Sequence, residues 1–549
     1  MRLTTVDQMA LPAGTLHAFA VRATPEPLLE QPVSFDQNLH VGRGDRPGSW
    51  MAVSFRLGER GGRPSIPALP EALPPNSGDT AEADRYSAQH ADIARVGRSS
   101  GRQRAGGDEI AEAPVANAEP DTDVLVRASA LRDALAAAWR RSVARHGTLR
   151  TVFTLDDGRV RLHEAAVDAG AWRDHPVAAG ESTRDALRRL LDAECRPFAT
   201  PSCLLTVVVP EGADAELDPR PVVVIASDHA HVDMWSLLIL ADEVRAVAEA
   251  PADAADADSG ARADADAEDA SDAGARATAA AATGAATGTA APDDLPAPFV
   301  DHTRALLEAP AAPADVTARW EEILRAGGGL LPVFPLPLGD VSTPSAAAVE
   351  VRDLLDADRF AALEARARAA GVRVIASVMT SLAAALQERA GNDEPVRALF
   401  PVHSRIEPRW RDSVGWYITN AVLEIAAPTP EACAAGIADA VRLGAHPLAP
   451  IFDRLGGVPA TPGLFAISWL DMRRMPLRLD ESLEPQFVSA VLPTDGLMIW
   501  FVVNESGLHL RCRYPDNPVA RASVGGWLDA LGARIVDAAG GAPALSHDS

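Results

Sequence analysis

The side chains best suited to chemistry lie in one short stretch, Ser227-Asp228-His229-Ala230-His231-Val232-Asp233-Met234-Trp235-Ser236. Histidine both accepts and donates a proton near neutral pH, because its unperturbed pKa is about 6.5. Asp233 follows His229 by four residues, so its carboxylate can either orient the imidazole or cap the helix that comes next. Both arrangements leave His229 as a candidate general base.

The same stretch contains His-x-His-x-Asp, a pattern that presents zinc ligands in metallo-hydrolases. That pattern normally continues with histidine, whereas here Met234 follows and no glycine comes after it. Further ligands would have to come from His302, His403 or His446, beyond a long low-complexity tract. We therefore expect no metal at this site and keep a zinc hydrolase as an alternative.

The candidate base must be positioned by the elements around it, and these predict an α/β protein. A buried strand is expected at 222–227 and a helix from about 235 to 249, so the cluster lies at a strand-to-helix junction. Upstream, we expect a strand at 49–57, a helix at 128–146 and a hairpin of 149–154 with 160–163. Downstream, we expect helices at 357–370 and 376–390 and strands at 348–351, 396–401, 418–425, 464–469, 497–504 and 508–514.

Two segments differ in composition from the rest. Residues 58–121 are rich in Gly, Pro, Ser, Ala and charge without apolar periodicity, which predicts a low-complexity insertion. Residues 251–294 form an Ala/Asp-rich tract with ten acids and two arginines, which predicts a disordered acidic linker. Residues 1–57 with 122–250 are therefore expected to form a first lobe, and residues 295–549 a second.

Composition also narrows the function. The net charge of −25 disfavours nucleic-acid binding, which needs concentrated positive charge. The four scattered cysteines signal neither a disulfide framework nor a thiolate zinc site. No apolar run approaches the roughly 20 residues that span a bilayer, and the N-terminus lacks a secretory signal, so we expect a cytoplasmic protein. No glycine-rich phosphate loop predicts a bound nucleotide cofactor.

Aligned on Asp228 to Met234, the stretch resembles the His-His-x-x-x-Asp-Gly motif of condensation domains and related polyketide-associated acyltransferases. These proteins share the chloramphenicol-acetyltransferase-like fold. His229 and Asp233 match the second His and the Asp of the motif, whereas Asp228 and Met234 replace its first His and its Gly. Other segments are also similar to these families, and with them the resemblance runs from Pro32 to about Pro518: Pro-Val-Ser-Phe-Asp-Gln at 32–37, Arg-His-Gly-Thr-Leu-Arg-Thr-Val-Phe at 145–153, Pro-Val-His-Ser-Arg at 401–405 and Ser-Val-Gly-Trp-Tyr-Ile-Thr-Asn at 413–420.

The resemblance implies two lobes of mixed sheets flanked by helices, with an active-site tunnel between them. It implies an acyl donor, either acyl-CoA or an acyl group on the phosphopantetheine of a carrier protein, as co-substrate, with no bound cofactor. The acceptor would be a hydroxyl or amine of a lipid, glycolipid or related molecule, which would allow peripheral membrane contact. A catalytically silent condensation-like protein that docks carrier proteins is a further alternative, because the motif is altered at Asp228 and Met234.

The resemblance also assigns roles to individual residues. His229 would be the general base and Asp233 its catalytic partner, with Arg405 paired to Asp233 and Asp228 in an orienting role. The candidates for oxyanion contact or for the tunnel wall are Ser468, Gly415 and Trp416.

Overall fold

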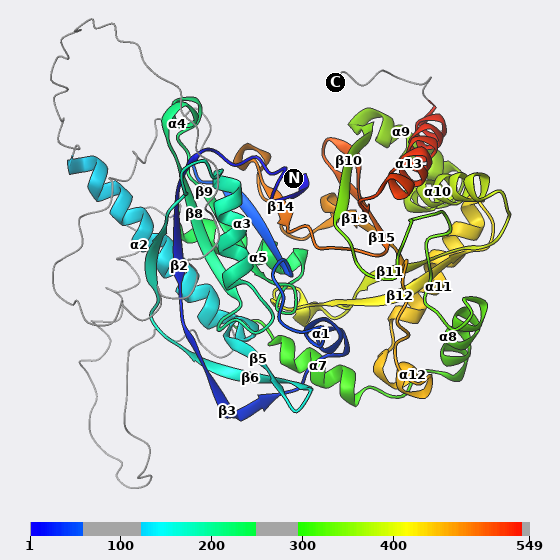
Figure 1. The fold of residues 1–549 in the computed structure, drawn as a ribbon, viewed down its shortest axis with the longest axis horizontal. Coiled ribbons are helices and arrows are strands. Elements are labelled where there is room, and N and C mark those ends of the chain that lie inside the picture. The colour runs from blue at the N-terminus through cyan, green and yellow to red at the C-terminus, as the bar shows by residue number, and fades with distance from the viewer. Residues whose placement is uncertain (1, 59–121, 249–294, 541–549) are drawn as a thin grey trace, which may run out of the picture.

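The computed structural model describes residues 2–58, 122–248 and 295–540. The predicted low-complexity segments at 58–121 and 251–294 lie outside these ranges, apart from Gly58. The described residues form two lobes, side by side in Figure 1. The three strands that bear most on the site agree closely with prediction: the expected 222–227 is observed as Val222–Asp228, and Ile418–Ile425 and Leu497–Asn504 agree in both bounds.

The first lobe is built on a seven-stranded mixed sheet. Its spatial order is β1 (Arg2–Thr5), β14 (Gln486–Ser489), β4 (Trp50–Arg56), β9 (Val222–Asp228), β8 (Cys203–Pro210), β2 (Gly14–Ala20) and β7 (Ala171–His175). The strands β4, β9 and β8 are antiparallel neighbours, and β9 is buried along its whole length. This central, fully buried position fixes the end of β9, where the candidate base follows.

Strand β14 belongs to the second half of the sequence but lies in the first sheet. It pairs antiparallel to β4 and parallel to β1, and its orange ribbon lies among the blue and green strands in Figure 1. Phe487 of β14 is buried in the same apolar cluster as Val53 of β4. The expected boundary at residue 295 therefore does not separate the two sheets completely, because one strand from the C-terminal half, β14, belongs to the first sheet.

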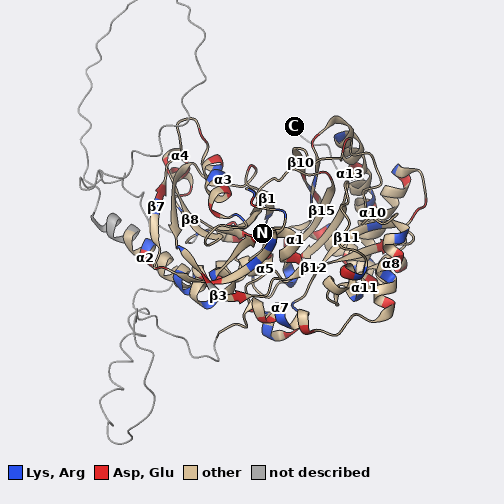
Figure 2. Cartoon of the chain, turned by 60° about the horizontal axis from the view of Figure 1, so that its bottom comes forward, with Lys and Arg blue, Asp and Glu red and all other residues tan. Residues whose placement is uncertain are grey.

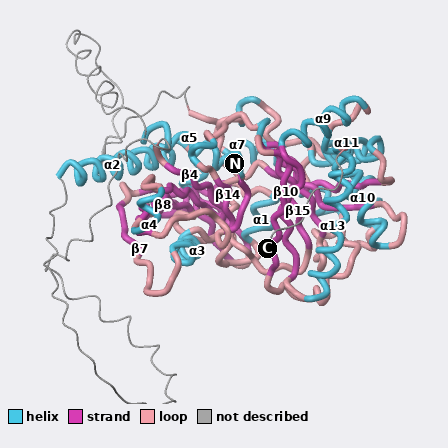
Figure 3. The backbone as a smooth tube through the Cα atoms, turned by 90° about the horizontal axis from the view of Figure 1, so that it is seen from above, coloured by secondary structure: helices cyan, strands magenta, loops and turns pink. Residues whose placement is uncertain are grey.

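Helices cover both faces of the first sheet. Helices α2 (Thr122–Arg145) and α5 (Met234–Ala248) share one apolar cluster with one face, and α3 (Thr183–Glu194) packs on the other. Figure 3 shows α2 and α5 above the strands and α3 below them. A short helix, α4 (Gly212–Leu217), connects β8 to β9. A buried sheet of this kind is a rigid base for a side chain at a strand end.

The second lobe is built on a six-stranded mixed sheet with helices on one face. Its spatial order is β10 (Ala347–Asp356), β16 (Gly507–Pro515), β15 (Leu497–Asn504), β13 (Phe465–Asp471), β11 (Val396–His403) and β12 (Ile418–Ile425). The principal covering helices are α9 (Ala357–Ala369), α10 (Val374–Ala390), α11 (Pro430–Gly444) and α13 (Pro518–Ala539), with α8 (Ala314–Ala326) and α12 (Ala449–Arg454) at the edge. Alternate residues of β15 face opposite ways: Ile499 and Phe501 join the helix-covered core, while Trp500 and Val502 pack with the apolar cluster of the first lobe.

Smaller elements close the junction of the lobes. Strands β3 (Ala23–Gln31), β6 (Arg159–Val167) and β5 (Thr151–Asp156) form a three-stranded sheet, and the last two are the predicted hairpin. Helices α1 (Phe35–Val41) and α7 (Phe299–Glu308) lie between the two large sheets in Figure 1. Helix α1 begins with a capping box in which Ser34 and Gln37 bond each other's backbone, which fixes where the helix starts.

Figure 2 shows acidic and basic residues interspersed along the outer helices. Among the described residues no single helix is long and apolar enough to cross a membrane. Helices α9 and α10 together have the length and composition of a span, but they are bent by 97° at their junction. Much of α10 is buried in the second lobe's core.

Candidate active site

The turn between β9 and α5 carries the predicted cluster and lies where the two lobes meet. The backbone amide of His229 donates to the Ser49 carbonyl at 3.1 Å, and that of His231 to the Asp228 carbonyl at 3.1 Å. From α1, the Gln37 side-chain amide donates to the Ala230 carbonyl at 2.9 Å. These hydrogen bonds fix the backbone of the turn, so its side chains have defined directions.

The His229 imidazole is fixed in one orientation by its own turn. Its Nδ1 lies 2.9 Å from the Val232 carbonyl oxygen, which only accepts, so Nδ1 carries the proton and Nε2 presents a lone pair. No described residue is hydrogen-bonded to Nε2. Burial, with a further contribution from His40, lowers the pKa of His229 below 6.5, so the ring is neutral at pH 7.

The His229 ring lies against an aromatic residue of the second lobe. Trp416 stacks on it with ring centroids 4.4 Å apart and an interplanar angle of 26°. The Trp416 Nε1 is buried and has no hydrogen-bond partner among the described residues. His40 of α1 meets Trp416 edge-on at 5.2 Å and lies 6.2 Å from His229. His229 therefore has ring neighbours from α1 and from the second lobe.

Asp228 takes part in a network that does not include the His229 ring. Its buried carboxylate accepts from His40 Nε2 at 3.1 Å, from the Ser49 hydroxyl and from the Ala230 amide at 2.9 Å. Arg46 donates to the other nitrogen of His40 at 3.2 Å. Asp228 thus orients the turn rather than the imidazole, and the sequence did not indicate His40 as its partner.

Asp233 is bonded to Arg405 and to the backbone of the junction rather than to His229. Its Oδ1 accepts from Arg405 Nη2 at 3.0 Å and from the Ser236 amide at 2.7 Å, which caps α5, and its Oδ2 accepts from the Tyr417 amide at 3.1 Å. The expected pair with Arg405 forms, and no hydrogen bond joins Asp233 to His229. The four-residue spacing permitted both outcomes, and the helix cap is the one observed.

Arg405 makes three further hydrogen bonds, of which the one to Ser236 also crosses between the lobes. Its Nη1 donates to the carbonyls of Trp410 at 2.7 Å and Ser413 at 2.5 Å, and its Nη2 donates to the Ser236 hydroxyl at 2.8 Å. Its guanidinium carbon lies 4.0 Å from the Tyr417 ring centroid. The side chain is fully buried, so these bonds are made without competition from water.

Gly415 closes the same junction by close approach. Its amide donates to the Ser236 hydroxyl at 3.0 Å, and that hydroxyl donates to its carbonyl at 2.8 Å. A Cβ atom at this position would lie 2.4 Å from the Phe299 ring. Gly415 therefore belongs to the packing that places Trp416, and only a residue without a side chain fits there.

Among the described residues, the other sequence candidates make no hydrogen bond or ring contact with His229. Ser468 is on β13, opposite Trp500 of β15, on the sheet face turned to the first lobe. His231 points away from the junction, with Nδ1 3.1 Å from the Thr148 carbonyl, and His302 of α7 packs among aromatic rings at about 5 Å. No three His, Cys, Asp or Glu side chains of residues 2–58, 122–248 and 295–540 come together as a metal site would require. The His-x-His-x-Asp spacing is thus not assembled into a ligand set.

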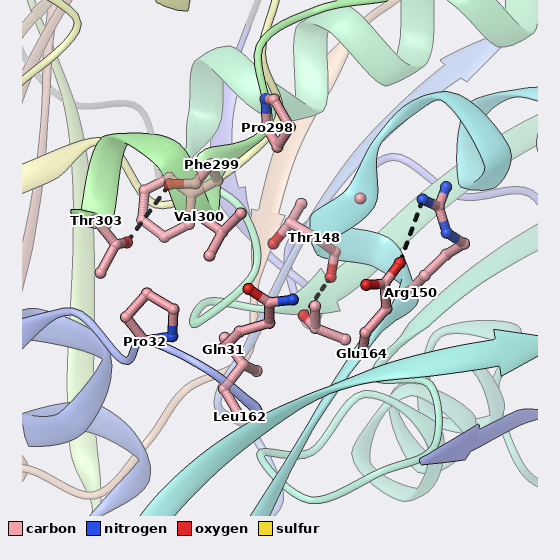
Figure 4. Close-up of a pocket in the computed structure, with 12 residues that line it drawn as sticks. Gln31, Pro32, Thr148, Arg150, Leu162, Glu164, Pro298, Phe299, Val300 and Thr303 are labelled. Atoms are coloured by element: carbon pink, nitrogen blue, oxygen red, sulfur yellow. Dashed lines mark hydrogen bonds and ion pairs between the residues drawn. The ribbon is translucent and has the colours of Figure 1, made fainter. Parts of the chain in front are cut away.

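A small pocket lies behind the turn, between α7 and the β5–β6 hairpin. Figure 4 shows Phe299 and Val300 on one side and Leu162 on the other, with the Arg150 and Glu164 pair at its edge, 4.0 Å apart. Its volume is about 140 Å³. Thr148, which also lines it, holds His231 through its carbonyl. The pocket therefore adjoins the turn on the His231 side and is not lined by His229.

The fold is that of condensation-domain-like proteins. The solved PapA2 acyl transferase superposes with a TM-score of 0.65 at 17% identity, covering 98% of this chain and 100% of that one. The first condensation domain of the calcium-dependent antibiotic synthetase, in complex with a substrate analogue, gives a TM-score of 0.55 at 15% identity over 94% and 98% of the two chains. The predicted α/β, two-lobed fold class is confirmed.

Sequence similarity points to the same branch. Acyltransferase PapA3 of Mycobacterium tuberculosis is 28% identical over 230 residues, 39% of this chain and 47% of that protein. Trehalose-2-sulfate acyltransferase PapA2 of Mycobacterium bovis is 27% identical over 245 residues, 41% and 51% of the two chains. The chain thus spans about half the length of the curated relatives it matches, and no family model matches it. The resemblance predicted from the sequence is confirmed.

Proposed function

We propose that the protein transfers an acyl group from a thioester to a hydroxyl or amine, with His229 as the general base. The observation that carries the proposal is the fixed tautomer: Nδ1 is held by the Val232 carbonyl, so Nε2 carries the lone pair of a proton acceptor. The lowered pKa keeps this nitrogen unprotonated at pH 7. The similarity to PapA3 and PapA2, both named acyltransferases, supports the same chemistry.

The reaction needs no covalent enzyme intermediate. Nε2 of His229 takes the proton of the acceptor as its oxygen or nitrogen forms a bond to the thioester carbon. The tetrahedral oxyanion then collapses, the carbon–sulfur bond breaks, and the imidazolium returns the proton to the leaving thiolate. Trp416 Nε1, which lacks a partner among the described residues, and the Ser468 hydroxyl are the candidate donors to the oxyanion.

The donor and acceptor are assigned by class only. The donor is acyl-CoA or a carrier-bound phosphopantetheine thioester, used as a co-substrate rather than as a resident cofactor. The acceptor is a lipid, glycolipid or related molecule, in keeping with the trehalose-2-sulfate acceptor in the name of the PapA2 relative. Peripheral contact with a membrane that carries such an acceptor remains a prediction.

Two other functions make different predictions. A carrier-docking protein without catalysis is motivated by the altered motif, yet Asp228 is held by His40 and Ser49 in an ordered turn rather than left without a role. A zinc hydrolase would lose activity to a chelator, whereas the proposed transferase would not.

The test combines a panel of acyl-CoAs and acyl-carrier proteins with sugar, lipid and amine acceptors, and detects the acylated acceptor by mass spectrometry. The proposal expects a product that needs both substrates and persists with a chelator. A chelator-sensitive hydrolysis product, or carrier-protein binding without any product across the panel, would contradict it.

A further inference from the structure

Two arginines on β16 lie on the sheet face turned toward the first lobe. Residues Leu510, Cys512 and Tyr514 of this strand belong to the helix-covered core, so Arg511 and Arg513, which alternate with them, point the other way. Arg511 is only 4% exposed, and Arg513 is partly buried. Two guanidinium groups are thus brought together in the interior of the molecule.

Neither guanidinium has an acidic partner among the described residues. Arg511 Nη2 donates to the Ser489 hydroxyl at 2.9 Å, and the Nε atoms of both arginines are buried without a hydrogen-bond partner in the described part of the chain. Two arginines in comparable positions do have one: buried Arg405 pairs with Asp233, and partly buried Arg319 with Glu424 at 2.8 Å. The lack of a carboxylate is notable in a chain with 76 acidic residues.

The charges of this cluster act on each other. Burial, and then the charge of Arg513, lowers the pKa of Arg511 to about 10, and burial together with nearby Arg43 lowers the pKa of Arg513. Their guanidinium carbons lie 5.0 and 5.9 Å from the centroid of the Trp500 ring. Buried cations are normally paired, because an unpaired one loses its hydration without compensation. A bound anion would supply that compensation.

The cluster lies on the side of the second sheet where the proposed reaction takes place. In register across the sheet, Arg511 is opposite Trp500, and Trp500 is opposite Ser468. Ser489, which accepts from Arg511, belongs to β14 in the first sheet, so the cluster reaches across the lobes. Arg43 follows α1, three residues after His40.

We propose that Arg511 and Arg513, which both lie near the Trp500 ring, bind an oxyanion group of a substrate: a sulfate, phosphate or carboxylate. The claim that the anion belongs to a substrate rests on the proposed function. The claim that the two arginines bind an anion does not depend on catalysis. The oxyanion has two sources, the phosphates of the acyl donor or an acidic substituent of the acceptor. Paired guanidinium groups suit all of these groups, because each offers several oxygens to planar N–H donors.

Binding of inorganic sulfate, measured by calorimetry at constant ionic strength, tests the site directly. We expect saturable binding to the wild type and at least a tenfold weaker association in Arg511→Gln/Arg513→Gln. The matched control is Arg521→Gln, which removes an exposed arginine of the same lobe that pairs with Asp516, and it should bind sulfate like the wild type. Equal binding by the double variant, or no binding by the wild type, would overturn the proposal.

A second variant distinguishes loss of sulfate binding from loss of the folded structure. Arg511→Met keeps the length of the side chain and removes an uncompensated buried charge, so it should be folded by circular dichroism and still lose sulfate binding. A folded Arg511→Met protein that retains wild-type affinity would also overturn the proposal.

Competition identifies the source of the oxyanion. Displacement of sulfate by CoA but not by pantetheine would assign the site to the donor's phosphates, and displacement by glucose 6-sulfate but not by glucose would assign it to the acceptor. Displacement by none of these would overturn its role as a substrate subsite. Repeating the titration with His229→Ala separates this result from the proposed catalysis, since that variant should bind sulfate unchanged.

Discussion

Asp233 and Arg405, 172 residues apart in the chain, form a buried ion pair that joins the two lobes beside the candidate base. The Asp233 carboxylate also caps α5 and accepts from the Tyr417 amide, and Arg405 also holds the carbonyls of Trp410 and Ser413. One pair therefore fixes the start of the helix after the His229 turn and the segment that brings Trp416 over it. In the proposed reaction we therefore assign this pair the role of positioning other groups.

Removing one side of this pair should be costly. Arg405→Met leaves the Asp233 carboxylate buried without its partner, and loss of one member of such a pair typically destabilises by about 3–5 kcal/mol. We expect a loss of this size in the free energy of unfolding, measured by urea denaturation. The control is Arg534→Ala, which breaks an exposed pair with Glu388 and should leave stability nearly unchanged. Similar losses in both variants would contradict the assignment.

Gly415→Ala should disturb the site through packing alone. The added methyl group would lie 2.4 Å from the Phe299 ring, so the segment that carries Trp416 must shift. We expect destabilisation of about 1–3 kcal/mol, as in overpacked cores, and a fall in acyl transfer. Gly525→Ala is the matched control, because no atom lies within 4 Å of its added methyl group in α13, and it should stabilise slightly. Wild-type stability and activity in Gly415→Ala would refute the packing role.

Asp36 of α1 should make stability depend on pH. Burial raises its pKa from 3.8 to about 7, with a smaller opposing effect from Asn420, whose side chain donates to it at 3.1 Å. Between these two pKa values the folded state keeps a proton that the unfolded state has released. The free energy of unfolding should therefore fall as the pH rises from about 4 to about 7. Asp36→Asn should remove this slope and be more stable at pH 8, by on the order of 2–4 kcal/mol. Parallel pH curves for the two proteins would contradict the raised pKa.

The pH dependence of transfer should report the base. Because the pKa of His229 is lowered below 6.5, the unprotonated form persists into mildly acidic solution. In kcat/KM against pH, the acid limb should therefore have its midpoint below 6.5, since activity is lost only when the ring protonates. An acid limb with its midpoint above 7 would show that another group, or a differently placed imidazole, limits the reaction.

Much of the site's neighbourhood could be predicted because it depends on local patterns. The apolar run before Asp228 gives β9, and the pairing of Arg405 with Asp233 followed from a family motif retained in both lobes. The strands at Ile418–Ile425 and Leu497–Asn504 are bounded by turn-forming residues and match in full.

The remaining features depend on contacts between distant segments. No local pattern places β14 in the first sheet, because its pairing with β4 joins residues more than 430 apart. His40 was missed for the same reason: its link to Asp228 exists only after α1 docks at the junction. The Ser34 and Gln37 capping box indicates the helix, but not which strand end it approaches.

The most direct test of the central claim is acceptor-dependent thiol release by His229→Ala compared with the wild type, after both are shown to have the same melting temperature. If Nε2 of His229 is the base, the variant should lose about 10²–10⁴-fold in rate while still binding the donor. A folded variant that transfers the acyl group at the wild-type rate would contradict the assignment.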